Sequence, residues 1–298
     1  MQISVRDWSL LFILSLLWGG AFFFVGVAVR EIPPLTLVLC RVGIAAVALY
    51  TYLKLSNGLP PNIRPLIVPA LIMGFLNNLV PFSLICWAQT EITSGLASIL
   101  NATTPIFSML VAHAILADER MAINKLIGVV AGFAGVAVLI GGSALKGVDG
   151  ATLGILACLG AALSYGFASV YGRTFRKMGV TPGAGALGQL IASTLMITPI
   201  VLIVDQPWTL PVPGVYTILS TLLLAVVSTA LAYLIYFRLL ATAGAVNAAL
   251  VTLLIPPSAI GLGYVFLGEV LEMRHLIGMG LILIGLIAVD GRVFRRNR

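Results

Sequence analysis

The chain has 298 residues, of which 60% are hydrophobic and only 9% are charged. Soluble domains usually carry about 25% charged residues, so this composition excludes an ordinary water-soluble protein and predicts lipid as the main solvent. The net charge of +7 does not indicate binding to nucleic acid, because the basic residues lie in short loops between long apolar runs.

Apolar runs of the length that crosses a bilayer as a helix, about 20 residues, recur along the whole chain. We expect the first run to be a retained helix, because it is too long for the core of a signal peptide. In chain order the runs predict ten transmembrane helices, at residues 8–28, 34–54, 65–87, 94–116, 124–143, 150–171, 183–204, 214–239, 244–267 and 274–293.

Lys and Arg are divided unequally between the two sets of loops. With the N-terminus inside, thirteen fall on the inner side: Arg6, Lys54, Arg64, Arg120, Lys125, Arg173, Arg176, Lys177, Arg238, Arg292, Arg295, Arg296 and Arg298. Three fall outside, namely Arg30, Lys146 and Arg274, and Arg41 lies within a span. Because cytoplasmic loops are rich in Lys and Arg, we predict a multi-pass protein of the cell inner (plasma) membrane with both termini in the cytoplasm.

The two halves of the chain resemble each other. The matched positions are Trp18-Gly19 with Tyr165-Gly166, Pro34 and Arg41 with Pro182 and Gln189, Gly135 with Gly285, and Glu119 with Glu269. An odd number of helices in each half turns the second copy upside down, an architecture of secondary transporters. We therefore predict an all-α integral membrane fold of ten helices in two inverted five-helix repeats, residues 1–147 and 148–298.

Several short motifs occur in a specific order. They are Leu17-Trp18-Gly19, then Arg41, then the stretch from Ser94 through Pro105 to Asp118-Glu119, which is echoed from Gly244 through Pro256 to Gly268-Glu269. In this the chain resembles the EamA-type members of the drug/metabolite transporter superfamily over nearly its whole length. The resemblance implies a five-plus-five inverted repeat and export of amino acids or related metabolites. The aromatic amino-acid exporters of the YddG type are a neighbouring group.

Arg41 is the one Lys or Arg that lies well away from the ends of a predicted span, and ionisable residues there are functional candidates. It follows Pro33 by eight residues, which at 1.5 Å per residue places it roughly 10–12 Å into the membrane. A guanidinium at that depth could hold a substrate carboxylate through two parallel hydrogen bonds. The alternative is a structural arginine that binds helix-end carbonyls or extends outward.

Other polar and aromatic residues within the spans are candidates for binding a small-molecule substrate. Rings can stack on an aromatic substrate or on its ammonium group, although small polar residues also serve helix packing. Together they favour an amphipathic zwitterion, an amino acid with an aromatic or large side chain, over a sugar phosphate. The full candidate set is Trp18, Arg41, Asn77, Asn78, Asn101, Tyr165, Gln189, Ser228 and Tyr233.

The sequence also suggests what the protein does without. The acidic residues lie in loops or near span ends, so we expect no buried carboxylate relay. Three cysteines in apolar runs have no metal-ligand spacing, and we expect no metal, cofactor or ATP site. Gly128, Gly132 and Gly135 form a contact surface for either another helix of the chain or a partner subunit, which leaves a homodimer open.

Two other classes of function compete with a carrier. An intramembrane enzyme would need a catalytic cluster of His, Asp or Cys, which the spans lack. A channel-like pore would need polar groups along an open path, whereas the polar residues here gather near one depth. We therefore favour a secondary transporter that works by alternating access.

Overall fold

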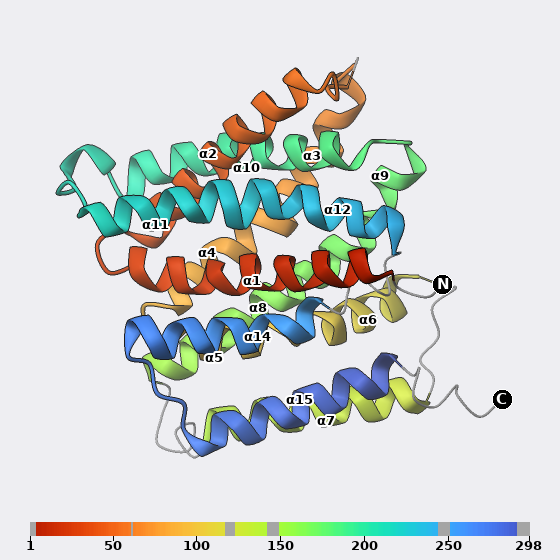
Figure 1. Cartoon of the computed structure of the whole chain (residues 1–298), viewed down its shortest axis with the longest axis vertical. Coiled ribbons are helices and arrows are strands. Elements are labelled where there is room, and N and C mark those ends of the chain that lie inside the picture. The colour runs from red at the N-terminus through yellow and green to blue at the C-terminus, as the bar shows by residue number, and fades with distance from the viewer. Residues whose placement is uncertain (1–3, 61, 117–122, 142–148, 244–250, 291–298) are drawn as a thin grey trace.

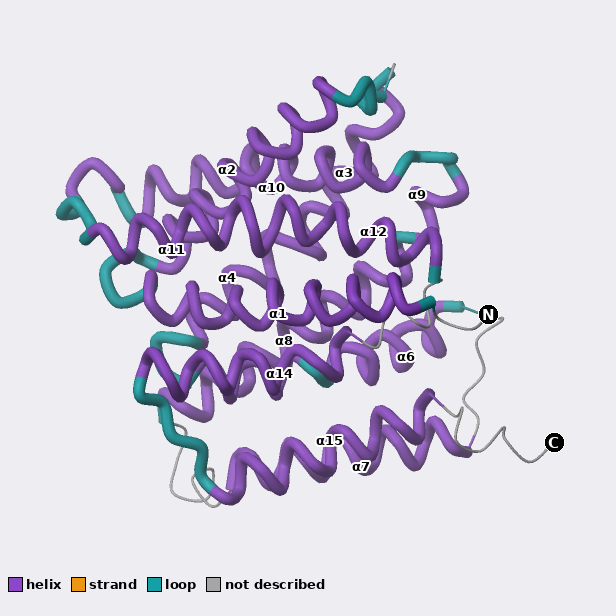
Figure 2. The backbone as a smooth tube through the Cα atoms, in the orientation of Figure 1, coloured by secondary structure: helices purple, strands orange, loops and turns teal. Residues whose placement is uncertain are grey.

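A computed structural model describes residues 4–60, 62–116, 123–141, 149–243 and 251–290. Its α-helices are α1 (Val5–Ala28), α2 (Pro34–Leu55), α3 (Ile67–Gly74), α4 (Val80–Ala88), α5 (Ser94–Asn101), α6 (Thr104–Ile115), α7 (Ile123–Ile140), α8 (Gly150–Tyr171), α9 (Arg173–Lys177), α10 (Pro182–Val204), α11 (Val215–Ala225), α12 (Ala232–Thr242), α14 (Val251–Leu262) and α15 (Met273–Asp290). Short 3-10 turns are η1 (Arg64–Leu66) and η4 (Pro207–Thr209), and π-helical turns are η2 (Phe75–Leu79), η5 (Val226–Leu231) and η6 (Gly263–Leu267). Within the described ranges there is no β-strand (Figure 2).

Seven helical segments of the described chain are long and apolar enough to cross a membrane. They are Val5–Ala28, Pro34–Leu55, Arg64–Ala88, Ser94–Ile115, Gly150–Phe175, Pro182–Val204 and Val215–Leu239, and each corresponds to a predicted span. Shorter apolar helices occupy parts of the other three predicted spans, at Leu126–Ile140, Val251–Leu267 and Met273–Ala288. Those three spans extend into residues that the structure does not describe, so the count of ten remains a prediction.

The surface is rich in large apolar side chains. Leu195 and Ile203, for example, are 67% and 74% exposed. Water would disfavour such a surface, whereas lipid chains accept it. The chain is therefore a multi-pass membrane protein.

The helices run side by side and the chain passes back and forth between two ends of the bundle (Figure 1). The start of α1 and the end of α15 lie at the same end, together with the α2–α3 and α9–α10 connections. The α1–α2 and α10–α11 connections lie at the opposite end. The face of the bundle that meets the cytoplasm stays a prediction, since it depends on the distribution of Lys and Arg.

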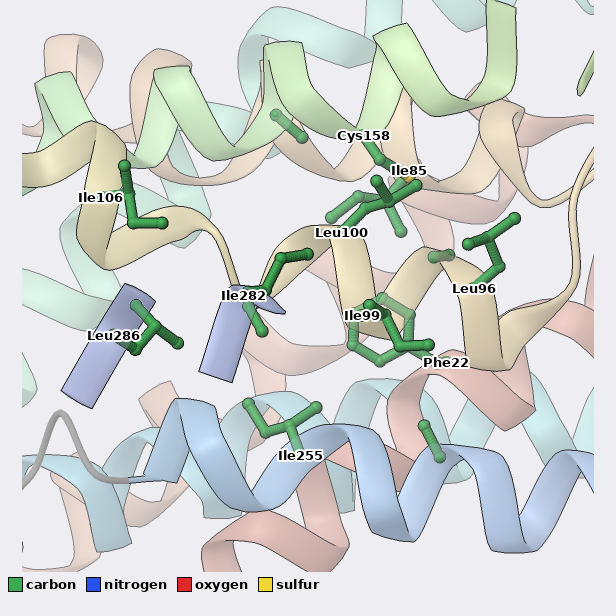
Figure 3. Packing of buried hydrophobic residues seen from close by; sticks show 14 of the residues in the cluster. Phe22, Ile85, Leu96, Ile99, Leu100, Ile106, Cys158, Ile255, Ile282 and Leu286 are labelled. Carbon is green, nitrogen blue, oxygen red and sulfur yellow. The ribbon is translucent and has the colours of Figure 1, made fainter. Parts of the chain in front are cut away.

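Two clusters of buried apolar side chains form the interior. In one of them, Leu96, Ile99 and Leu100 of α5 pack among Phe22 of α1 and Ile85 of α4 (Figure 3). The other forms mainly between α2 and α10 and is extended by residues of α1 and α4. Close packing of this kind supplies the dispersion energy that holds membrane helices together, because lipid offers little hydrophobic drive between them.

Gly135 of α7 faces α15 of the same chain, whereas Gly132 faces the side chain of Ile106 in α6. Helices α7 and α15 lie against each other (Figure 1). A Cβ added at Gly135 would lie 2.7 Å from the carbonyl oxygen of Gly278, and one added at Gly285 would lie 2.6 Å from that of Gly128. Backbones this close leave no room for a side chain, which explains glycine at these positions. The predicted glycine surface is therefore used within the subunit, and a homodimer stays an untested prediction.

Pro81 accounts for the irregular turn η2 between α3 and α4. In a π-helical turn the carbonyl of residue i bonds to the N–H of residue i+5, as Phe75 does with Val80. The corresponding partner of the Leu76 carbonyl would be Pro81, which has no N–H. The hydroxyl of Ser164 in α8 donates to this carbonyl instead, at 2.6 Å.

Candidate functional site: a buried polar cluster around Arg41

Arg41 lies two turns into α2 and is only 7% exposed. Its Nε donates a hydrogen bond of 3.0 Å to Oγ1 of Thr229 in η5. Its guanidinium carbon Cζ lies 3.6 Å from the ring centroid of Phe82 in α4, a cation–π contact. The arginine thus joins helices from both halves of the chain.

Arg41 is a buried cation, and its hydrogen bond and its ring contact within the described residues are both with neutral groups. Its hydrogen bond to Thr229 is the only one it makes within the described chain, and no carboxylate of that part pairs with it. Removing a guanidinium from water costs several kcal/mol. A hydrogen bond to a charged group returns about 1.5–3 kcal/mol and a desolvated cation–π contact about 2 kcal/mol. An anion at the terminal nitrogens Nη1 and Nη2 would offset the rest of the cost.

A second network of polar side chains joins η2, α10 and α12. Nδ2 of Asn78 donates to Oγ of Ser193 at 3.1 Å, and its Oδ1 accepts the hydroxyl of Tyr233 at 2.8 Å. Nδ2 of Asn77 donates to Oε1 of Gln189 at 2.9 Å. Asn78 and Ser193 are fully buried, and a satisfied network at such depth fixes the helices relative to one another.

Ser228 and Asn101 make none of the hydrogen bonds of this network. Ser228 is 1% exposed and its hydroxyl has no hydrogen-bond partner in the described chain, although its neighbour Thr229 contacts Arg41. Asn101 ends α5, and its Oδ1 is buried without a partner there. No contact of the described residues links Asn101 to Arg41.

The two aromatic residues matched between the halves, Trp18 and Tyr165, each pack against both apolar clusters. Tyr165 packs against the apolar cluster that contains Tyr233 and Phe82, and the Phe82 ring contacts Arg41. The Trp18 ring lies 5.4 Å from the ring of Tyr236, centroid to centroid. Aromatic surface therefore borders the cluster at the junction of the two apolar cores.

Sequence reasoning missed Ser193, Phe82 and Thr229. Ser193 could have been found, because it follows Gln189 by four residues and so shares its helix face. Phe82 looks like any apolar residue of a span. Thr229 lies in a π-helical turn, where an extra residue changes the direction in which the side chains point. The spacing rule of an α-helix therefore could not predict whether Thr229 or Ser228 points toward α2.

Several curated transporters are similar to the chain over nearly its full length. It is 27% identical over 281 residues to the "Uncharacterized inner membrane transporter YedA" of Escherichia coli (strain K12), covering 94% of this chain and 89% of the relative. It is 28% identical over 315 residues to the "Probable amino-acid metabolite efflux pump" of Salmonella typhimurium, covering 99% and 98%. It is 27% identical over 305 residues to the "Probable terminal-alkyne amino-acid exporter" of Streptantibioticus cattleyicolor, covering 100% and 97%.

The fold also matches a solved chain described as "Crystal structure of protein". The TM-score is 0.66 at 17% identity, over 99% of this chain and 100% of the other. The sequence profile of the EamA-like transporter family matches the chain twice, at residues 8–141 and 152–289. Since these matches cover most of the sequence, the protein belongs to the EamA-like transporter family.

Proposed function

We propose that the protein is a secondary transporter that exports amino acids or similar small amphipathic metabolites, with aromatic amino acids favoured as in the YddG-type exporters. The observation that carries the proposal is Arg41, a buried cation whose contacts in the described chain are all neutral. A substrate carboxylate would supply the missing charge through two parallel hydrogen bonds. A phosphate, with its greater charge, would call for further cations beside Arg41.

The names of two relatives support an amino-acid substrate, since one is named as an efflux pump for amino-acid metabolites and the other as an exporter of an amino acid. The surroundings of Arg41 support a preference for aromatic substrates. Tyr233 belongs to the apolar cluster that contains Phe82, the ring that contacts Arg41, and Tyr165 and Trp18 pack against that cluster. Rings at this position can stack on an aromatic side chain or contact an ammonium group.

Reciprocal packing supports two inverted repeats that alternate in access. Helix α1 of the first half packs on α14 of the second half. Its counterpart in the second half, α8, packs on α5 and α6 of the first half. Arg41 contacts η5, while Gln189, its match in the other repeat, contacts η2. Each therefore reaches the π-helical turn of the opposite half, which is what inverted repeats at 1–147 and 148–298 would produce.

The proposal is tested with purified protein in liposomes. Uptake of labelled phenylalanine is measured as a function of concentration for the wild type, Arg41→Lys and Arg41→Ala, per amount of folded protein. Phenylalanine methyl ester and phenylethylamine, which lack the carboxylate, serve as competitors. We expect Arg41→Ala to raise the half-saturating phenylalanine concentration about ten- to a hundredfold, with a smaller rise for Arg41→Lys. Inhibition by the ester and the amine should not change.

Equal losses of affinity for the acid and for its ester would reject the carboxylate role of Arg41. Transport of sugar phosphates without transport of any amino acid would reject the substrate class. Saturable uptake with counterflow is expected of a carrier, whereas flux that rises linearly with concentration would indicate a pore.

A further inference from the structure

We propose that Thr229 and Phe82 are positioning residues that hold the Arg41 guanidinium so that its Nη1–Nη2 edge is the substrate-binding edge. The inference rests on the proposed function and narrows its ligand to one planar carboxylate. It assigns the specificity of the site to two residues that need not touch the substrate themselves.

Thr229 occupies the Nε side of the guanidinium. Its side chain is 1% exposed, and its hydroxyl donates to the backbone carbonyl of Leu224 at 2.8 Å. A hydroxyl has one proton, so with that proton committed the oxygen can only accept from Nε of Arg41, at 3.0 Å. The two bonds in series polarise each other. A carboxylate is therefore kept from the edge that contains Nε.

The π-helical turn η5 brings Thr229 to this position. The hydroxyl reaches a carbonyl five residues earlier in the chain, whereas in an α-helix the usual acceptor for a threonine hydroxyl is four residues earlier. Another buried threonine of this span shows the α-helical pattern, since the Thr221 hydroxyl donates to the backbone carbonyl of Thr217 at 2.8 Å. The extra residue in the turn changes which side chain faces α2.

Phe82 covers one face of the guanidinium. The ring is 4% exposed, and its centroid lies 3.6 Å from Cζ of Arg41. A ring stacked on the face keeps an anion from binding there. With the Nε side and one face occupied, the two terminal nitrogens remain, and their parallel N–H groups match the two oxygens of a carboxylate.

The test compares variants of one hydroxyl. Thr229→Val keeps the shape but removes the acceptor, and Thr229→Ser keeps the oxygen. With the liposome assay described above, we expect Thr229→Val to raise the half-saturating phenylalanine concentration about tenfold, with the maximal rate per folded carrier unchanged. Thr229→Ser should restore the wild-type value. Competition by phenylethylamine should be the same in all three proteins.

Thr221→Val is the matched control. Thr221 is 5% exposed, lies in the same span and also donates its hydroxyl to a backbone carbonyl, but it makes no bond to Arg41. Its replacement removes the same kind of helix-backbone bond as Thr229→Val without removing an acceptor for Nε. We expect wild-type half-saturation. A tenfold rise for Thr221→Val as well would overturn the positioning role, because loss of the backbone bond would then explain both variants.

A double substitution separates this inference from the proposed function. In an Arg41→Ala background, Thr229→Val should cause no further loss of affinity, because no guanidinium remains to be positioned. If Arg41→Ala itself leaves phenylalanine affinity unchanged, the carboxylate anchor fails and the proposed function fails with it. If Arg41→Ala weakens affinity but Thr229→Val does not, or Thr229→Ser fails to restore it, the positioning role alone is overturned.

Discussion

Glu269 and Ser94 join the two halves of the chain through the first turn of α5. Oε1 of Glu269 accepts the backbone N–H of Ser94 at 2.9 Å, and its Oε2 accepts the Ser94 hydroxyl at 2.8 Å and the N–H of Gly95 at 3.2 Å. The first N–H groups of a helix have no partner within it and lie at the positive end of its dipole. A carboxylate from a segment more than 170 residues away satisfies them here.

Removing this cap should lower stability. We expect Glu269→Ala to reduce the free energy of unfolding by about 1–2 kcal/mol and Glu269→Gln by less, since the amide keeps one acceptor. The measurement is thermal unfolding in detergent, followed by intrinsic fluorescence. Glu272→Gln is the control, because Glu272 pairs with Arg274 at an exposed position and such pairs contribute little. An equal loss for the control would contradict the capping role.

The contact between α7 and α15 should tolerate no added methyl group at Gly135. The new Cβ would lie 2.7 Å from the Gly278 carbonyl oxygen and 3.0 Å from the Ile282 nitrogen, and backbone atoms cannot move aside. We expect Gly135→Ala to cost about 1–3 kcal/mol, measured by the same thermal unfolding. Gly280→Ala on α15 meets nothing within 4 Å and should leave stability unchanged or slightly raised. A fully stable Gly135→Ala protein would show that the two helices pack differently.

The predicted orientation can be checked by cysteine labelling. In a background in which Cys40, Cys86 and Cys158 are replaced, we expect Ser56→Cys to react with a membrane-impermeant maleimide only after the cells are opened. Ser56 is exposed, and it is a better site than Asn57, whose φ of +54° disfavours most residues. Val212→Cys, at a position 89% exposed on the opposite loop, should react in intact cells. The reverse pattern would invert the topology.

Tyr165 should influence the choice between aromatic and aliphatic substrates. Tyr165→Phe keeps the ring at the junction of the two apolar clusters, and Tyr165→Leu removes it. An aromatic pair contributes about 0.5–1.5 kcal/mol beyond buried area, so we expect the Leu variant to lose roughly two- to tenfold in affinity for phenylalanine relative to leucine. The measurement is competition between the two amino acids in liposomes. A preference unchanged in Tyr165→Leu would place the substrate ring elsewhere.

The positions of the membrane helices could be predicted from the sequence because they depend on a local property. A helix that crosses lipid must bond all of its own backbone groups and be apolar over about 20 residues, and both conditions are visible in a continuous stretch of sequence. The seven long segments correspond to predicted spans for that reason. The same local reasoning placed Arg41 within a span and Gly135 on a contact surface, but it named no partner for either.

The partners were decided by tertiary structure. Gly135 meets Gly278 within the chain, and Arg41 meets Thr229 across 188 residues of sequence. Thr229, rather than the predicted Ser228, faces Arg41 in a π-helical turn, where the spacing rule of an α-helix no longer applies. Apolar helices can pack in many ways with similar energy, and the sequence of one helix does not say which neighbour it meets. The pairing of Arg41 with Thr229 therefore depends on the packing of α2 against η5, which brings an acceptor to the buried arginine.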